Sequence, residues 1–272
     1  MHFVFCITHQ PNIAIDLDRC ASIVWLGAAG QAPQIGHPVL DVHTNYPDLM
    51  AWHAFLTGAS GTFAIRRFLC DQQQEFSDFD LLTLTQYRKF ISRDSFGGIS
   101  ESYPSMRFIN DAARIPRYAD WFVEPAKYFL ISRPLALGSM FGQYANVHHA
   151  PDLLRYLAIA VELEIITGQE CLDFINHPVL IPAGIEVGTF PVNIFLTLTK
   201  QLEAVCLNFL ERHRPIKIDA YQRRALAFCN ERLGSYLLQK VLFEIFDNTI
   251  PQDVIGHMHT VDIGAADYRI GV

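Results

Sequence analysis

The sequence predicts an α/β fold in which a mixed, mostly parallel sheet is flanked by helices, with a helical C-terminal segment. Short, almost continuously apolar runs at 3–7, 22–26 and 81–85 are typical of strands buried on both faces of a parallel sheet. Other stretches carry apolar residues at three- and four-residue spacing, which is the helical pattern. Half of the 272 residues are apolar and 18% are charged, which indicates a folded protein with a substantial core.

The composition argues against several classes of protein. The formal net charge is −7, whereas nucleic-acid binders carry a basic footprint. No run of 18 or more apolar residues occurs, so no membrane-spanning helix is expected. Residues 1–7 lack a basic region and indicate a first strand rather than a signal peptide.

The six cysteines are scattered, without a CxxC pair or metal-like spacing. This usage predicts a reducing, cytoplasmic setting. The basic cluster at 212–214 leaves open a peripheral contact with the inner membrane or with phosphate. Since no repeat or linker divides the chain, we expect a single domain over residues 1–250 and a C-terminal tail over 251–272.

The first two strands lead into candidate ligand-binding turns. The strand at 3–7 is followed by Thr8 and His9, as at the start of many nucleotide-binding α/β domains. The strand at 22–26 is followed by Gly27-Ala28-Ala29-Gly30, a small-residue loop that lets backbone approach a ligand closely. This loop is neither a GxGxxG motif nor a P-loop, so an ordinary turn is the alternative.

A helix is expected from near Asn45 to Gly58, with Pro47 and Asp48 in its first turn. His53 on its apolar side is interpreted as a core or boundary histidine rather than a ligand.

The run at 81–85 changes abruptly into Gln86-Tyr87-Arg88-Lys89. In an open α/β sheet, ligands bind just beyond the carboxyl ends of the strands, so this polar cluster is an expected place for chemistry. The alternative is that Arg88 and Lys89 only mark the solvated end of a strand.

Later elements follow the same patterns. We expect an irregular, functional or mobile loop over 91–118, a strand at 128–131 with a glycine-containing loop after it, extended segments at 179–182 and 190–195, and a helix whose apolar face spans 198–209.

Two histidines precede a helix that begins at Pro151 and Asp152. His148 and His149 therefore lie at a helix N-terminus, where N–H groups favour anions, and phosphate binding or acid–base chemistry is plausible. Metal binding is less favoured because adjacent histidines rarely face one ion. Polar residues that only cap the helix are the alternative.

Asp219 is expected to cap a long terminal helix that carries Arg223, Arg224 and Arg232. Glu231 can neutralise only one or two of these guanidinium groups. They are candidates for bidentate binding of a diphosphate, with inter-helix salt bridges as the alternative.

Taken in order, these segments resemble a bacterial glycosyltransferase-like family found in capsule, exopolysaccharide and O-antigen gene sets. The family's strand ending His-Tyr-Arg-Arg-Tyr-Phe is similar to Gln86-Tyr87-Arg88-Lys89-Phe90. The helix-start glutamate is Asp48 here, and Gln86 replaces a histidine, so a general base at that position is not expected. The other similar segments are 7–10, 26–30, 143–153, 193–195 and 221–233.

The resemblance implies a GT-A-like, Rossmann-type fold and a glycosyltransferase. Such an enzyme moves a sugar from a nucleotide-sugar, such as a UDP-sugar, to a glycan or lipid-linked acceptor in bacterial surface polysaccharide biosynthesis. The alternatives are a non-catalytic nucleotide-sugar or glycan-binding member of an assembly complex and, as a third class, a metal-dependent hydrolase. The DxD at 78–80 matches a metal-binding pattern of many such transferases, but it precedes its strand and is interpreted as structural. A metal-independent reaction with no required cofactor is expected, with Mn²⁺ or Mg²⁺ left open.

Roles follow from the chemistry, since a departing diphosphate needs cations and an acceptor hydroxyl needs a base. Arg88, helped by Arg223 or Arg232, is expected to neutralise the diphosphate. The base or acceptor contact is expected among three residues, which are His148, His149 and Asp152. The expected nucleotide-binding residues are Thr8, His9, Gly27, Ala28, Asp48 and Tyr87.

Overall fold

The computed structural model describes residues 1–15, 17, 21–27, 32, 36–99, 106–110, 128–213 and 220–262. Its main sheet has the strand order β3-β2-β1-β4-β5-β12-β7-β6, with β11 paired to β4 and β8 to β12. A small sheet pairs β9 with β10. The strands are β1 (His2–Thr8), β2 (Ala21–Trp25), β3 (Val39–Asp41), β4 (Leu81–Gln86), β5 (Lys89–Ser92), β6 (Gly98–Ile99), β7 (Met106–Ile109), β8 (Ile131–Ser132), β9 (Leu135–Ala136), β10 (Val179–Leu180), β11 (Gly188–Pro191) and β12 (Ile255–Val261).

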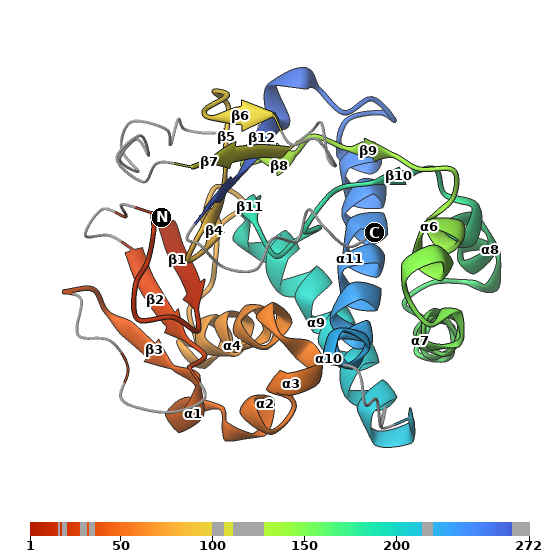
Figure 1. Ribbon diagram of the computed structural model, residues 1–272, viewed down its shortest axis with the longest axis horizontal. Helices are drawn as coiled ribbons and strands as arrows, with labels where there is room; N and C mark the ends of the chain where they lie inside the picture. The colour runs from red at the N-terminus through yellow and green to blue at the C-terminus, as the bar shows by residue number, and fades with distance from the viewer. Residues whose placement is uncertain are drawn as a thin grey trace.

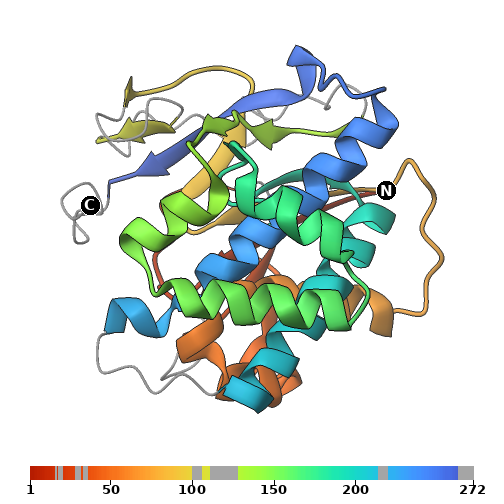
Figure 2. The ribbon, with the colours of Figure 1, turned by 90° about the vertical axis from the view of Figure 1, so that its right-hand side faces the viewer.

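The helices form layers against this sheet (Figure 1). α4 packs on β1 and β2, α9 packs on β4 and β11, and α11 and α7 pack on α9. Figure 2 shows the outer helices α6, α7 and α8 in front of α11. The helices are α1 (Val42–Asn45), α2 (Pro47–Ala51), α3 (His53–Leu56), α4 (Gly58–Asp71), α6 (Met140–Val147), α7 (Ala150–Glu162), α8 (Gly168–Asn176), α9 (Val192–His213), α10 (Ala220–Arg223) and α11 (Ala225–Ile245).

The predicted α/β fold is confirmed. Strands β1, β2 and β4 lie where the apolar runs placed them, and they pair in parallel in the order β2-β1-β4. Residues Leu81 to Thr85 are all buried, as expected for a central strand. Antiparallel pairs join β4 to β5 and β5 to β12, so the sheet is mixed.

The helix predicted from near Asn45 to Gly58 is divided into α2 and α3, and the helix that follows it was not predicted. Thr57 has φ 49° and ψ −120°, which ends α3, and Gly58 begins the 14-residue helix α4. Glycines usually oppose a helix, but here they allow close packing. A Cβ at Gly61 would lie 2.7 Å from Cγ2 of Ile7 on β1, so only glycine fits this contact without a shift.

Two other segments differ from the prediction. The glycine-containing loop after 128–131 includes α6, which Ser139 caps by accepting a hydrogen bond from the Gly142 N–H at 3.0 Å. The extended segment predicted to reach residue 195 ends at Pro191, where α9 follows at once. In α9 the buried residues Val192, Phe195 and Leu198 already follow helical spacing, which the prediction of an extended segment overlooked.

The segments expected to be an irregular loop and a tail contribute to the sheet. Strands β5, β6 and β7 fall within or next to residues 91–118, of which 100–105 and 111–118 lie outside the described part. β12, within the expected tail, lies between β5 and β7, antiparallel to β5 and parallel to β7. This pairing is set by partners more than 140 residues away, which no local pattern reveals.

No helix in the described part of the chain is long and apolar enough to cross a membrane.

Candidate functional site

The carboxyl ends of β1, β2 and β4 meet at one edge of the sheet. The Leu26 N–H donates to the Thr8 carbonyl at 2.8 Å, and the Tyr87 N–H donates to the Ile7 carbonyl at 2.9 Å. The His9 ring stands edge-on to the Tyr87 ring, with 4.9 Å between centroids. The structure therefore brings together the ends of three strands that the sequence marked as candidate ligand-binding turns.

Thr8 and Gly27 both have local structural roles at this edge. The buried Thr8 hydroxyl donates to the Gln10 carbonyl at 2.7 Å and accepts from the Gln10 N–H, which shapes the turn after β1. A Cβ at Gly27 would lie 2.0 Å from the Trp25 ring, so the glycine makes room for the indole. Ala28 lies outside the described residues.

Tyr87 and Arg88 form a tight turn between β4 and β5. The Ala14 N–H donates to the Tyr87 carbonyl and the Val261 N–H to the Arg88 carbonyl, both at 2.8 Å. Arg88 is 5% exposed, and its guanidinium lies 5.7 Å from the centroid of the Tyr87 ring. β12 binds the turn from one side, so Arg88 is fixed at the edge of the sheet. The alternative that Arg88 only marks the solvated end of a strand is therefore wrong.

Charged side chains from separate elements gather beside this turn. Lys89 and Glu186 are each partly buried, and Arg88, Arg224 and Glu231 interact electrostatically with one or both of them. Burial, followed by the nearby Glu231 carboxylate, raises the pKa of Glu186 to about 7. Burial, with Arg88 and Arg224 nearby, lowers the pKa of Lys89. Strongly shifted groups of this kind are typical of functional sites.

Glu186 lies on a loop that packs directly on α11. Gly184 has φ +51°, and a Cβ there would be 3.0 Å from the Glu231 carbonyl oxygen, so the loop approaches as only glycine allows. The Ile181 N–H donates to the Ser235 hydroxyl at 2.8 Å, and the Ala183 N–H donates to Oε1 of Glu231 at 2.7 Å. These contacts fix the backbone that carries the Glu186 carboxyl group.

His148 lies in an aromatic cluster on the opposite wall. Its ring stacks on Phe228 at 4.1 Å and on Tyr221 at 5.4 Å between centroids. Burial, with Arg232 and Arg224 nearby, lowers the pKa of His148 to about 4. Nδ1 has no hydrogen-bond partner in the described part of the chain. A neutral, stacked imidazole is thus held between the two arginines.

Arg224 links the two walls. It interacts electrostatically with His9 at the strand edge, with Glu186 on the loop and with His148, which follows α6. Its guanidinium lies 5.3 Å from the centroid of the Phe228 ring. The sequence singled out the neighbouring Arg223, which is exposed. The sequence does not indicate which of the adjacent residues Arg223 and Arg224 faces inward, because this depends on the rotation of the helix about its axis.

Arg232 is buried and joins α11 to α6. It donates to the Phe228 carbonyl at 2.8 Å and to Oε1 of Gln143 at 2.5 Å, and it lies 4.9 Å from the centroid of the Tyr144 ring. No carboxylate in the described ranges lies within ion-pair distance of Arg232. A buried charge without a counter-charge is costly, which favours a nearby anionic ligand.

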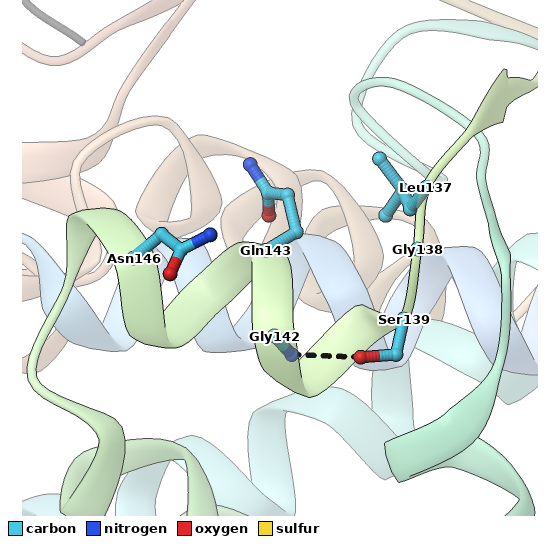
Figure 3. Close-up of a pocket in the computed structure, with 6 residues that line it drawn as sticks. All are labelled: Leu137, Gly138, Ser139, Gly142, Gln143 and Asn146. Atoms are coloured by element: carbon cyan, nitrogen blue, oxygen red, sulfur yellow. Dashed lines mark hydrogen bonds between the residues drawn. The ribbon is translucent and has the colours of Figure 1, made fainter.

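A hollow of about 330 Å³ lies along α6, next to the Arg232 contact. Gln143 and Asn146 project from the same side of the helix, and the Ser139–Gly142 cap forms another part of the rim (Figure 3). The lining residues are Leu137, Gly138, Ser139, Gly142, Gln143 and Asn146.

His149 and Asp152 lie at the N-terminus of α7. His149 is the N-cap residue and its side chain is 51% exposed, whereas Asp152 is buried. Nδ1 of His149 lies 3.4 Å from Oδ1 of Asp152, and Nη1 of Arg155 lies 3.8 Å from the same oxygen. Asp152 therefore takes part in a local charge cluster on α7.

Asp48 lies in an ion-pair network. Nη1 of Arg67 donates to both Asp48 carboxylate oxygens, at 2.9 and 2.7 Å, and Arg67 also pairs with the buried Glu203. Contact between Asp48 and a nucleotide would require this bidentate pair to open.

The DxD at the start of β4 has a structural role. The Asp80 carboxylate accepts hydrogen bonds from the chain N-terminus and from the Ser77 N–H, which holds the amino end of β4. Within the described ranges, no group of three or more histidine, cysteine, aspartate or glutamate side chains is placed to hold a metal ion.

The sequence reasoning missed Glu186 as a site residue. A carboxylate between two glycines, in Gly184-Ile185-Glu186-Val187-Gly188, was an available signal, because glycine-flanked loops often support functional groups. Arg224 was a candidate for diphosphate binding together with its neighbours but was not singled out, and Lys89 was given no role in the chemistry.

The sequence matches no protein-family model and no curated protein. The structure is similar to the apo structure of WbbM, a bifunctional glycosyltransferase, with a TM-score of 0.69 and 13% sequence identity. The match covers 96% of this chain and 45% of the WbbM chain, so this chain spans less than half of that protein's length. The similarity supports the predicted Rossmann-like glycosyltransferase fold.

Proposed function

We propose that this protein is a glycosyltransferase that moves a sugar from a nucleotide-sugar donor to a glycan or lipid-linked acceptor. The observation that carries the proposal is a set of cations beside the carboxyl ends of the strands. Arg88 and Arg224 act electrostatically on Lys89, and Lys89 and Arg224 act on Glu186. Negative charge develops on the departing diphosphate during sugar transfer, and cations placed beforehand stabilise it.

The nucleotide is proposed to lie over the turns after β1 and β2, near Thr8, His9 and Gly27, with Tyr87 beside it. Ligands of open α/β sheets bind at this position, and the edge-on pair of His9 and Tyr87 offers aromatic surface to a base or ribose. Arg88 and Arg224 would then face the diphosphate. Because these guanidinium groups can neutralise the diphosphate, we propose that the reaction does not need a metal ion.

The acceptor is proposed to bind along the hollow on α6. Arg232 occupies Oε1 of Gln143, so the amide nitrogen of Gln143 is left to donate to other groups. With Asn146 on the same side of the helix, it offers the amide groups that bind sugar hydroxyls (Figure 3). His149 and Asp152 remain predicted acceptor contacts at the adjoining helix. Bacterial surface polysaccharide is the product class we propose, on the basis of the sequence resemblance.

A thermal-shift screen tests the proposal. Purified protein is mixed with UDP-, GDP-, CMP- and dTDP-sugars, with and without Mn²⁺, and we expect one nucleotide class to raise Tm. Arg88→Ala should abolish most of that shift in Tm. His149 is half-exposed, and His149→Ala should keep the shift in Tm but lower the rate of sugar transfer.

Three outcomes separate the alternatives. If no nucleotide-sugar raises Tm, the glycosyltransferase proposal fails. Stabilisation without any hydrolysis or transfer would support the non-catalytic binding protein, which the replacement of the family histidine by Gln86 favours. If Arg88→Ala and His149→Ala both retain full turnover and binding, the assignment of these two residues is wrong.

A further inference from the structure

The Glu186 carboxyl group is held by a chain of buried hydrogen bonds. Nδ2 of Asn230 donates to Oε1 of Glu186 at 3.0 Å. Oδ1 of Asn230 accepts from the Tyr156 hydroxyl at 3.2 Å and from the Cys206 thiol at 3.4 Å. The hydroxyl and the thiol donate to the amide oxygen, and the amide nitrogen faces Glu186. The chain thus fixes both the Asn230 amide and one carboxyl oxygen.

The second carboxyl oxygen of Glu186 faces the strand edge. A Cβ built on Gly58 would lie 3.5 Å from Oε2 of Glu186 and 3.3 Å from Nε2 of Gln86. The start of α4 therefore lies next to Oε2, at the carboxyl end of β4. One oxygen is anchored while the other is directed at the proposed reaction site.

The charged groups that act on Glu186 come from α11 and β5. Glu231 on α11 favours its neutral form, whereas Lys89 on β5 and Arg224 at the start of α11 favour the carboxylate, as does the Asn230 hydrogen bond. Burial adds to the effect of Glu231, and together they raise the pKa of Glu186 to about 7. A carboxyl group with such a pKa accepts a proton efficiently near neutral pH.

We propose that Glu186 is the catalytic base of the transfer reaction, and that Asn230 and Tyr156 are positioning residues that act through it. The inference rests on the proposed glycosyltransferase function. In the step, the acceptor oxygen forms a bond to the anomeric carbon while the bond from that carbon to the phosphate oxygen breaks. The hydroxyl proton passes to Oε2 of Glu186, and the departing nucleotide takes the electron pair.

The base predicted from the sequence is less suited to this step. His148 is stacked between aromatic rings and lies near Arg224 and Arg232, which oppose its protonation. His149 is half-exposed at the start of α7 and lies against Asp152. Glu186 and Gln86 both lie next to Gly58, so Glu186 supplies near the position of Gln86 a group that can transfer a proton.

The first test is Glu186→Gln, measured with the nucleotide-sugar that most stabilises the wild-type protein. We expect the release of free nucleotide to fall by about 100-fold or more, the usual size of general-base catalysis, while the thermal shift by the same nucleotide-sugar persists. The matched control Glu211→Gln, at an exposed position on α9, should keep near wild-type activity. Glu186→Gln with near wild-type turnover would overturn the inference.

The second test uses two substitutions that should move the pH profile in opposite directions. The wild-type kcat/KM should fall below pH about 7, where the base becomes protonated. Asn230→Ala removes a hydrogen bond to the carboxylate and should move this limb to higher pH. Glu231→Gln removes a repelling charge and should move it to lower pH. A purely structural role would lower kcat without displacing the limb, and an unmoved limb would contradict the proposal. Tyr156→Phe provides a milder variant if Asn230→Ala does not fold.

A third measurement needs no substrate. A carboxyl group with a pKa raised from 4.5 to about 7 stabilises the fold while it is neutral, and that stability is lost as pH rises through about 7. The Tm of Glu186→Gln relative to wild type should therefore rise between pH 4.5 and 7. A flat difference would overturn the inference, even if no nucleotide-sugar were turned over. A rising difference without nucleotide binding would instead count against the proposed function alone.

Discussion

The ring of His259 accepts a hydrogen bond at Nε2 from the backbone N–H of Phe96, across 3.0 Å. His259 lies on β12, is fully buried and stacks on Phe90, with 4.7 Å between ring centroids. Because Nε2 accepts, the ring must be neutral at that nitrogen. One histidine from the C-terminal strand therefore holds the segment after β5 next to the turn that carries Arg88.

Acidification is expected to weaken this contact. Burial lowers the pKa of His259 from 6.5 to about 4, so its neutral form contributes stability at neutral pH. That contribution is lost as pH falls from 6.5 through about 4 and amounts to about 3 kcal/mol. Urea unfolding between pH 7 and 4 measures the loss. His259→Gln, which can still accept from Phe96, should show a smaller decline, and equal slopes for the two proteins would contradict this prediction.

Adjacent arginines offer a matched pair for testing the diphosphate site. Arg224 faces His9 and Glu186, whereas Arg223 is exposed. Arg224→Ala should weaken the binding of UDP, used as a probe, by about 10- to 100-fold, which is the usual worth of a charged hydrogen bond. Arg223→Ala should change it less than twofold. Isothermal titration calorimetry measures the Kd of each variant for UDP. An equal loss of affinity in the two variants would mean that the arginines act only through long-range charge.

A bulky side chain in the α6 hollow should separate acceptor binding from donor binding. Asn146→Trp would fill much of the hollow of about 330 Å³. We expect KM for the acceptor to rise at least about tenfold, equivalent to about 1.4 kcal/mol, with the nucleotide-induced thermal shift unchanged. Leu154→Trp, at a 45% exposed site on α7, is the control. An unchanged KM in Asn146→Trp would exclude the hollow as the acceptor site.

The contact between α4 and β1 can be tested by a double-mutant cycle. Gly61→Ala places a methyl group 2.7 Å from Cγ2 of Ile7, and overpacking of this kind costs about 1–3 kcal/mol. Ile7→Ala should remove the clash, so the double variant should be more stable than the sum of the two single effects predicts. Chemical denaturation gives the three free energies of unfolding, and simple additivity would show that the glycine is not required by this contact.

Local patterns in the sequence predicted those helices and strands in which the same face, or both faces, stay buried from one end to the other. The run at 81–85 is apolar because both faces of β4 are covered, and the spacing of apolar residues in α7 and α9 reflects one buried face each. The polar turn after β4 could also be located, because strand ends are marked by an abrupt change in polarity. α4 was missed because its small residues serve contact with β1 rather than helix formation.

The sequence by itself determined the α/β class, the central strands and the motif that ends in Arg88. Only the tertiary structure decided that β12 lies between β5 and β7, that Arg224 rather than Arg223 faces the site and that Glu186 lies near the end of β4. Strand pairing over more than 160 residues depends on contacts that no local window contains. Likewise, the rotation of α11 and the approach of the Gly184 loop follow from packing, and this packing sets the environment that raises the pKa of Glu186.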